Sequence, residues 1–184
     1  MHKRYFHTFE KLFAEIKPTF IGELGTHDGD SAKQFCNLAL RLNQKDKVVY
    51  HGYDAFEIVK GDKNFAKQER NAKGNGNLYL AENRLRGVKL AHLNRFDFKL
   101  FKGFTQDTLT KDIEFDFVYI DAGHSYDSVV HDWNRVKNSK MIVFDDTKLK
   151  SVRDAIRDHV EPTHSVEFTV RSETVRGLAI VRNF

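Results

Sequence analysis

Residues 21 to 29 read Ile-Gly-Glu-Leu-Gly-Thr-His-Asp-Gly, and this stretch decides the fold. Phe20–Leu24 is a short apolar run with the β-branched and aromatic content of a buried strand. Gly25 and Gly29 permit a tight turn and a close approach of a ligand to the backbone. Ser31 is a candidate N-cap for an amphipathic helix that follows. The segment therefore predicts a strand, a glycine turn and a helix.

The spacing of the acid and the glycines indicates the kind of ligand. It is Glu-x-Gly-x-x-x-Gly, which differs from the Gly-x-Gly-x-x-Gly pattern that binds a dinucleotide pyrophosphate. We therefore expect a nucleoside without phosphate, with Glu23 available to bind a cationic amino group; S-adenosylmethionine is such a ligand. For the motif taken alone, an ordinary strand–turn–helix of any α/β protein is an equally good interpretation.

A second acid follows the next apolar run. Val48–Tyr53 has the character of a buried strand, and Asp54 stands at its end, about thirty residues after Glu23. In nucleotide-binding α/β sheets, a carboxylate at this place accepts hydrogen bonds from the ribose hydroxyls. An aspartate at a strand end is also a common turn former. Together with Glu23 and the two glycines, Asp54 favours a ligand site.

Strands and helices alternate along the chain, which predicts a mostly parallel sheet with helices on both faces. The expected strands cover residues 20–24, 48–53, 98–102, 115–120 and 141–144, and then a hairpin made of the alternation at Val166, Phe168 and Val170 and the run 178–181. We therefore expect one α/β domain over residues 1–184. Its fold class is a doubly wound (Rossmann-like) sheet of seven strands with a C-terminal antiparallel hairpin.

The helix signals are of several kinds. An N-terminal helix should stop before Pro18, and another should cover about residues 80–93. Another helix should start at Ser125 after the fourth strand. A further one opens with Ser151-x-x-Asp154, which has the spacing of a capping box.

Length and composition limit the class of protein. The chain has 184 residues, 40% of them hydrophobic, which suffices for one domain with a three-layer core. Its net charge is +4, and its single cysteine, Cys36, excludes an internal disulfide. It contains neither the run of about 20 apolar residues that a membrane helix needs nor the apolar core of a signal peptide. We therefore expect a cytoplasmic protein with no membrane partner.

The connection between the second and third expected strands, residues 57–97, is unusually long, and we expect it to carry a lid or a substrate-binding surface. From Lys60 to Lys102 the chain has eleven lysines and arginines against four acidic residues. A solvated helix face is the more common explanation of such a charge run. The other explanation is a basic rim for an anionic substrate, and the sequence leaves both open.

Three acids and a histidine follow the fourth and fifth strands. Asp121 ends one strand, and Asp145 and Asp146 end the next. Because adjacent parallel strands end side by side, the three carboxylates should converge and repel one another unless a cation or a proton compensates. Oxygen ligands with open positions suit Mg²⁺, although each aspartate alone is more simply explained as a turn or cap residue. His124 lies in the same turn, where its imidazole is a candidate general base.

These residues together resemble a known family. The array Glu-Leu-Gly-Thr-His-Asp-Gly (23–29), Tyr-Asp (53–54), Tyr-Ile-Asp-Ala-Gly-His-Ser-Tyr (119–126), Asp-Trp (132–133) and Val-Phe-Asp-Asp-Thr (143–147) is similar to the class I S-adenosylmethionine-dependent methyltransferases. Among these, the chain is most similar to the macrocin-type (sugar) O-methyltransferase group. The resemblance covers nearly the whole chain, and its more specific part is Ile-Asp-x-x-His-Ser-Tyr.

The resemblance implies roles for individual residues. The methionine part of the cofactor would lie at the first glycine turn, the ribose on Asp54, and the adenine at a pair after the third strand. The implied cofactor-binding residues are Glu23, Gly25, Thr26, His27, Gly29, Asp54, Phe104, Thr105 and Asp121. The family often has an acid where this chain has Phe104. Asp121, Asp145 and Asp146 match the family's metal ligands for Mg²⁺ or Mn²⁺, and His124 and Asp121 match its catalytic residues.

The resulting hypothesis is a Mg²⁺-assisted O-methyltransferase. It would transfer the methyl group of S-adenosylmethionine to a hydroxyl of a small polyhydroxylated acceptor, a sugar or related metabolite. The basic segment would be compatible with an anionic acceptor. One alternative is a metal-free methyltransferase acting on nucleic acid or a nucleotide, which is less favoured. Another is a non-catalytic scaffold that binds the cofactor. The sequence does not define the oligomeric state.

Overall fold

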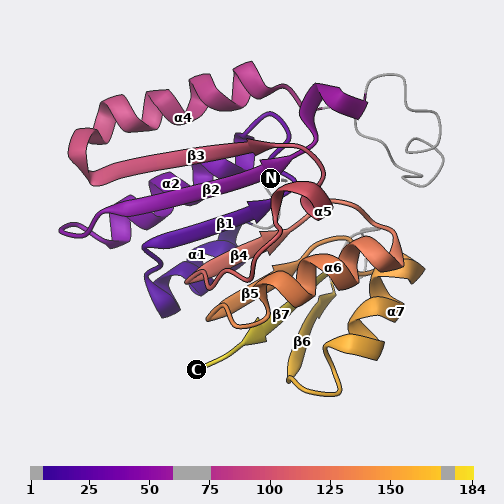
Figure 1. The fold of residues 1–184 in the computed structure, drawn as a ribbon. Helices are drawn as coiled ribbons and strands as arrows, with labels where there is room; N and C mark the ends of the chain where they lie inside the picture. Colours follow the sequence, from indigo (N-terminus) through magenta and orange to yellow (C-terminus); the bar gives the residue numbers. More distant parts are fainter. Residues whose placement is uncertain (1–5, 60–75, 171–176) are drawn as a thin grey trace.

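A computed structural model describes residues 6–59, 76–170 and 177–184, and it contains one seven-stranded sheet (Figure 1). The strand order is β3-β2-β1-β4-β5-β7-β6. Strands β1 to β5 run parallel to one another, and β7 pairs antiparallel with both β5 and β6. This arrangement confirms the predicted doubly wound sheet with a terminal hairpin.

The strand positions follow the apolar runs of the sequence. The strands are β1 (Phe20–Leu24), β2 (Val48–Asp54), β3 (Phe96–Lys102), β4 (Phe117–Ile120), β5 (Met141–Phe144), β6 (Val166–Val170) and β7 (Gly177–Arg182). Their limits agree with the predicted ones to within two residues. The largest differences are that β3 starts earlier, at Phe96, and β4 starts later, at Phe117.

Two hydrophobic cores lie on opposite faces of the sheet. One contains the apolar residues of α1 (Phe6–Ile16), α2 (Asp30–Leu42) and α4 (Leu78–His92), and Cys36 is buried there as expected. The other contains those of α6 (Tyr126–Val136) and α7 (Lys150–His159), and the short α5 (Thr105–Thr108) lies next to α6 (Figure 1). Two 3₁₀ turns, η2 (Phe56–Val59) and η3 (Leu93–Arg95), complete the described elements.

Two predicted helix caps are wrong. Gly29 occupies the N-cap of α2 in a left-handed conformation, so Ser31 is free to turn inward and donate to the Glu23 carboxylate. Helix α7 begins at Lys150 with Leu149 as its N-cap, and no side chain caps it. Ser151 instead donates to the backbone oxygen of His124 at 2.6 Å. In both cases the serine hydroxyl donates to a residue outside its own helix, whereas the local spacing had predicted a bond with the backbone of that helix.

The insertion 57–97 is described only in part. Its second half is α4, which buries Ala81, Leu85 and Val88 and packs against α2 and β3. Helix α4 is therefore part of the helical layer on one face of the sheet. Residues 60–75 lie outside the described residues, and the predicted lid stays a prediction.

The described part of the basic segment is matched to local partners. Arg84 pairs with Asp30, Arg86 with Glu82, Lys89 with Asp97 and Lys102 with Glu57. Arg95 donates to the backbone oxygens of Leu40 and Asn43, and Lys99 lies over the ring of Phe101. From Arg84 to Lys102 the charge run therefore behaves as a solvated surface, while Lys60 to Lys73 lie outside the described residues.

The reversal of strand order between β1 and β4 places the ends of these strands at one edge. Glu23 is in register with Tyr119, and Leu24 with Ile120. The backbone nitrogen of Asp121 donates to the oxygen of Leu24 at 2.7 Å, one residue beyond β4. In open α/β sheets, ligands bind where the strand order reverses.

Gly25 makes this junction possible. A Cβ on Gly25 would lie 2.0 Å from the backbone oxygen of Asp121, and its φ of +98° is one that side chains rarely adopt. A Cβ on Gly29, which has a φ of +78°, would lie 2.9 Å from the Cα of Ala81 in α4. Each glycine therefore admits a second backbone segment, in addition to the turn that the sequence predicted.

Among the described helices, none combines the length and apolar character that crossing a membrane requires.

We expect Gly25→Ala to lower the free energy of unfolding by more than about 2 kcal/mol, because the new Cβ strains the backbone and displaces Asp121. Denaturant unfolding measures this change. The matched control is Gly87→Ala in α4, where a Cβ would meet nothing within 4 Å. That change should raise stability by about 0.5–1 kcal/mol. A Gly25→Ala protein as stable as the wild type would show that the β1–β4 junction tolerates a side chain.

Candidate active site

The candidate site lies at the edge of the sheet where β2, β1, β4 and β5 end. Asp54 ends β2, and Gly25 follows β1. Asp121 follows β4 and Asp145 follows β5, with the Asp145 nitrogen donating to the oxygen of Ile120 at 3.0 Å. Residues separated by up to 120 positions in the sequence are thus neighbours at one edge.

Glu23 lies beneath the glycine turn and has no exposed surface. Its carboxylate accepts a 2.5 Å hydrogen bond from the Ser31 hydroxyl and another of 2.5 Å from the Tyr50 hydroxyl. Burial raises the pKa of Glu23 to about 7, against the lowering effect of the two hydroxyls. The predicted contact of Glu23 with a cationic amino group stays a prediction, and in this structure both carboxylate oxygens are engaged by hydroxyls.

Asp54 joins the turns after β1 and β2. It accepts the backbone N–H of His27 at 2.7 Å through one oxygen and that of Phe56 at 2.5 Å through the other. Burial raises the pKa of Asp54, and these two N–H groups oppose the rise. Each carboxylate oxygen has two lone pairs, so Asp54 retains acceptor capacity for a ligand hydroxyl. His27 has a φ of +52°, and its N–H bond to Asp54 holds that conformation.

Phe104 and Thr105, the predicted adenine pair, begin α5 next to this turn. Phe104 is the N-cap of α5, and Thr105 is buried. The backbone N–H of Gly103 donates to the backbone oxygen of Asp54 at 2.9 Å, so the end of β3 is held next to the residue predicted to bind the ribose. The structure thus brings the two predicted nucleoside-binding positions to the same side of the edge.

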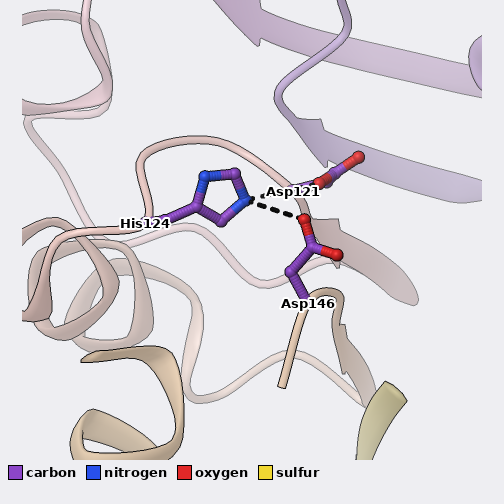
Figure 2. A group of neighbouring side chains, drawn as sticks. All are labelled: Asp121, His124 and Asp146. Carbon is purple, nitrogen blue, oxygen red and sulfur yellow. Dashed lines mark ion pairs between the residues drawn. The ribbon is translucent and has the colours of Figure 1, made fainter. Parts of the chain in front are cut away.

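Asp121, His124 and Asp146 form a compact group (Figure 2). His124 Nε2 lies 3.2 Å from an Asp146 oxygen and 3.8 Å from an Asp121 oxygen. One donor atom from each residue lies within 4.8 Å of the others. Asp146 has a φ of +50°, a conformation uncommon for residues other than glycine that marks functional sites more often than other positions. The predicted base and two of the three predicted metal ligands are therefore together.

The third predicted metal ligand, Asp145, is oriented differently. It accepts a 2.5 Å hydrogen bond from the hydroxyl of the buried Tyr119, and its other oxygen accepts the N–H of Asp146 at 2.7 Å. Burial, followed by the charge of Asp121, raises the pKa of Asp145 to about 6. Among the described residues, the group with metal-binding geometry contains His124 in place of Asp145.

The donors of this group fit a divalent cation. Two carboxylates and an imidazole suit Mn²⁺ better than Mg²⁺, because the imidazole nitrogen is a softer ligand than the oxygens that Mg²⁺ prefers. The loop that carries His124 is fixed from both sides. Ser151 donates to the His124 oxygen, and Ser125 caps α6 by accepting the N–H of Ser128 at 3.2 Å. The group can therefore hold an ion or accept a proton from a fixed position.

The sequence patterns did not predict the hydroxyls that support the site. Those of Ser31, Tyr50 and Tyr119 donate to its acids, and that of Ser151 donates to the backbone oxygen of His124. The two tyrosines had a usable signal. Tyr50 and Tyr119 lie within predicted buried strands, and a buried phenol needs a hydrogen-bond partner. Only the register between strands, however, shows which carboxylate each phenol reaches.

Solved structures share this fold at low sequence identity. The O-methyltransferase NovP superposes with a TM-score of 0.67 and 14% identity, over 95% of this chain and 78% of that one. The O-methyltransferase TomG from Streptomyces achromogenes, in complex with SAM and involved in tomaymycin synthesis, gives 0.60 and 18% over 99% and 80%. An O-methyltransferase from Bacillus cereus in complex with SAH gives 0.60 and 17% over 100% and 82%.

No curated protein matches the sequence. A family model described as a methyltransferase domain matches residues 23–147, from the buried acid of β1 to the threonine after the paired aspartates. The match spans both halves of the candidate site and more than half of the chain. The chain therefore belongs to this methyltransferase-domain family.

Proposed function

We propose that the protein is an S-adenosylmethionine-dependent O-methyltransferase that modifies a hydroxyl of a small polyhydroxylated acceptor, a sugar or related metabolite, with help from a divalent metal. The observation that carries this proposal is the group of Asp121, His124 and Asp146 directly beside the glycine turn. A proton acceptor and oxygen donors thus adjoin the place where a methyl donor is expected.

The glycine turn and Asp54 support the choice of methyl donor. Family membership, and structural neighbours solved in complex with SAM or SAH, agree with it. When bound, S-adenosylmethionine supplies a methyl group on a positively charged sulfur, which is a good leaving group. The protein must then supply alignment and deprotonation.

The residues of the group can divide this work. The His124 imidazole would accept the proton of the acceptor hydroxyl, and the Asp146 carboxylate, 3.2 Å from Nε2, would stabilise the imidazolium that forms. Asp121 and Asp146 would hold the metal, and Asp145, which the sequence predicted as a third ligand, would support Asp146 by accepting its backbone N–H. A divalent cation supplies a positive charge that lowers the pKa of a coordinated hydroxyl. Ser151 would keep the His124 loop in place during the reaction.

The nucleic-acid alternative depended on the basic segment. Because the described basic residues from Arg84 to Lys102 have local partners, they do not favour it. Nor does any observation favour a scaffold without activity. A screen of hydroxylated acceptors with and without Mg²⁺, monitored by S-adenosylhomocysteine formation, tests the proposal. Cofactor binding without turnover on any acceptor would contradict it.

Asp54→Asn should weaken the binding of S-adenosylhomocysteine by about 1.5–3 kcal/mol, because the amide loses charge-assisted bonds to the ribose. Calorimetry measures this loss. An analogue without the ribose hydroxyls is the control, and the wild type and the variant should bind it equally. Equal losses for both ligands would mean that Asp54 acts only by holding the turn.

The wild type should bind Mn²⁺ or Mg²⁺ weakly, and more tightly once an acceptor with two adjacent hydroxyls is present. Asp146→Asn should reduce metal affinity at least about tenfold, because the ion loses a charged ligand, and leave S-adenosylhomocysteine affinity unchanged. Asp154→Asn, which removes a surface carboxylate paired with Lys150 and Arg157, is the matched control. A chelated enzyme that methylates its acceptor at full rate would exclude a role for metal.

His124→Ala should reduce turnover by about 10²–10⁴-fold, with partial recovery at high pH where the acceptor hydroxyl ionises without a base. His7→Ala is the control, since the His7 side chain is 84% exposed on α1. Steady-state rates across pH measure both variants. A His124→Ala enzyme with an unchanged pH profile would exclude His124 as the base.

A further inference from the structure

We infer that Glu23 is a positioning residue, which sets the shape of the β1–α2 turn through Ser31 and Tyr50 and acts on the cofactor without touching it. This inference rests on the proposed binding of S-adenosylmethionine at that turn. It assigns to Glu23 a role different from the ammonium contact that its sequence motif predicts.

The contacts of Glu23 reach both ends of the turn. Ser31, in the first turn of α2, donates to one carboxylate oxygen at 2.5 Å. Tyr50, on the adjacent strand β2, donates to the other at 2.5 Å, and its hydroxyl also lies 3.3 Å from the Thr26 hydroxyl. The residue that enters the turn, Thr26, and the one that leaves it, Ser31, are thus tied to one carboxyl group.

Glu23 has no surface open to a ligand in this structure. The residue is completely buried, and so is Tyr50. Thr26, whose hydroxyl lies 3.3 Å from that of Tyr50, is 1% exposed. Burial also raises the pKa of Glu23 to about 7, so an ammonium group would have to offset the cost of ionising a fully buried carboxyl group.

The turn connects Glu23 to the residues on the nucleoside side of the site. His27 follows Thr26 and holds Asp54 through its backbone N–H at 2.7 Å. If Thr26 and Ser31 lose their common anchor, the backbone of His27 loses its fixed position relative to Asp54. A change at Glu23 should therefore weaken the binding of the adenosine part of the ligand as well as that of its amino acid part.

Two ligands and two variants separate positioning from contact. S-adenosylhomocysteine carries the ammonium group, and 5′-methylthioadenosine lacks the whole amino acid part. The variants are Glu23→Gln and Tyr50→Phe, the second of which removes only a buried hydroxyl. Asp116→Asn is the matched control, because Asp116 accepts bonds from Thr19 and Phe20 at the opposite end of β1. Calorimetry gives the affinities, and thermal unfolding shows that each variant is folded.

We expect Glu23→Gln and Tyr50→Phe each to weaken both ligands roughly tenfold, the loss expected for one hydrogen bond of this kind. The double variant should lose no more affinity than the single variant with the larger loss, because both changes break one network. Asp116→Asn should lose stability and keep both affinities. If Glu23→Gln does not fold, Tyr50→Phe alone still gives the result.

Two outcomes would overturn the inference. In one, Glu23→Gln weakens S-adenosylhomocysteine alone and Tyr50→Phe binds as the wild type does, which is the pattern of a direct ammonium contact. In the other, both variants bind both ligands normally. A wild-type protein that binds neither ligand would instead contradict the proposed function itself.

Discussion

The close approach of two backbones at the junction of β1 and β4 is the constraint on which the rest of the site depends. Gly25 has no Cβ where one would lie 2.0 Å from the backbone oxygen of Asp121. This contact continues the strand pairing one residue past the sheet and fixes the glycine turn against the loop of Asp121 and His124. The nucleoside side and the acid side of the site are therefore parts of one rigid edge.

Much of the fold could be predicted because it depends on burial along the chain. Apolar runs such as Met141–Phe144 and the alternation in Val166–Val170 need only the sequence, and both were predicted correctly. The edge that holds Asp54, Asp121 and Asp145 followed from the rule that parallel strands end together. The grouping of Asp121 and Asp146 with His124 needed no further information.

The remaining details depend on partners distant in sequence. Ser31 and Ser151 have the local spacing of caps, but each hydroxyl bonds to a site residue on another element. Asp145 was expected to bind a metal together with Asp121 and Asp146, yet it is buried and accepts a hydrogen bond from the Tyr119 hydroxyl. A buried carboxylate needs a hydrogen-bond donor, and the register between strands determines which donor lies within reach.

The position of β7 in the sheet has a consequence for synthesis of the chain on the ribosome. Strand β6 precedes β7 in the sequence, but it joins the sheet only through β7, which also completes the pairing of β5. Until Gly177–Arg182 has left the ribosome, the nascent chain exposes the free edge of β5 close to the acidic end of the site. An unpaired strand edge is a template for association with other chains. Pairing of β7 with β5 therefore both completes the sheet and removes a site of association.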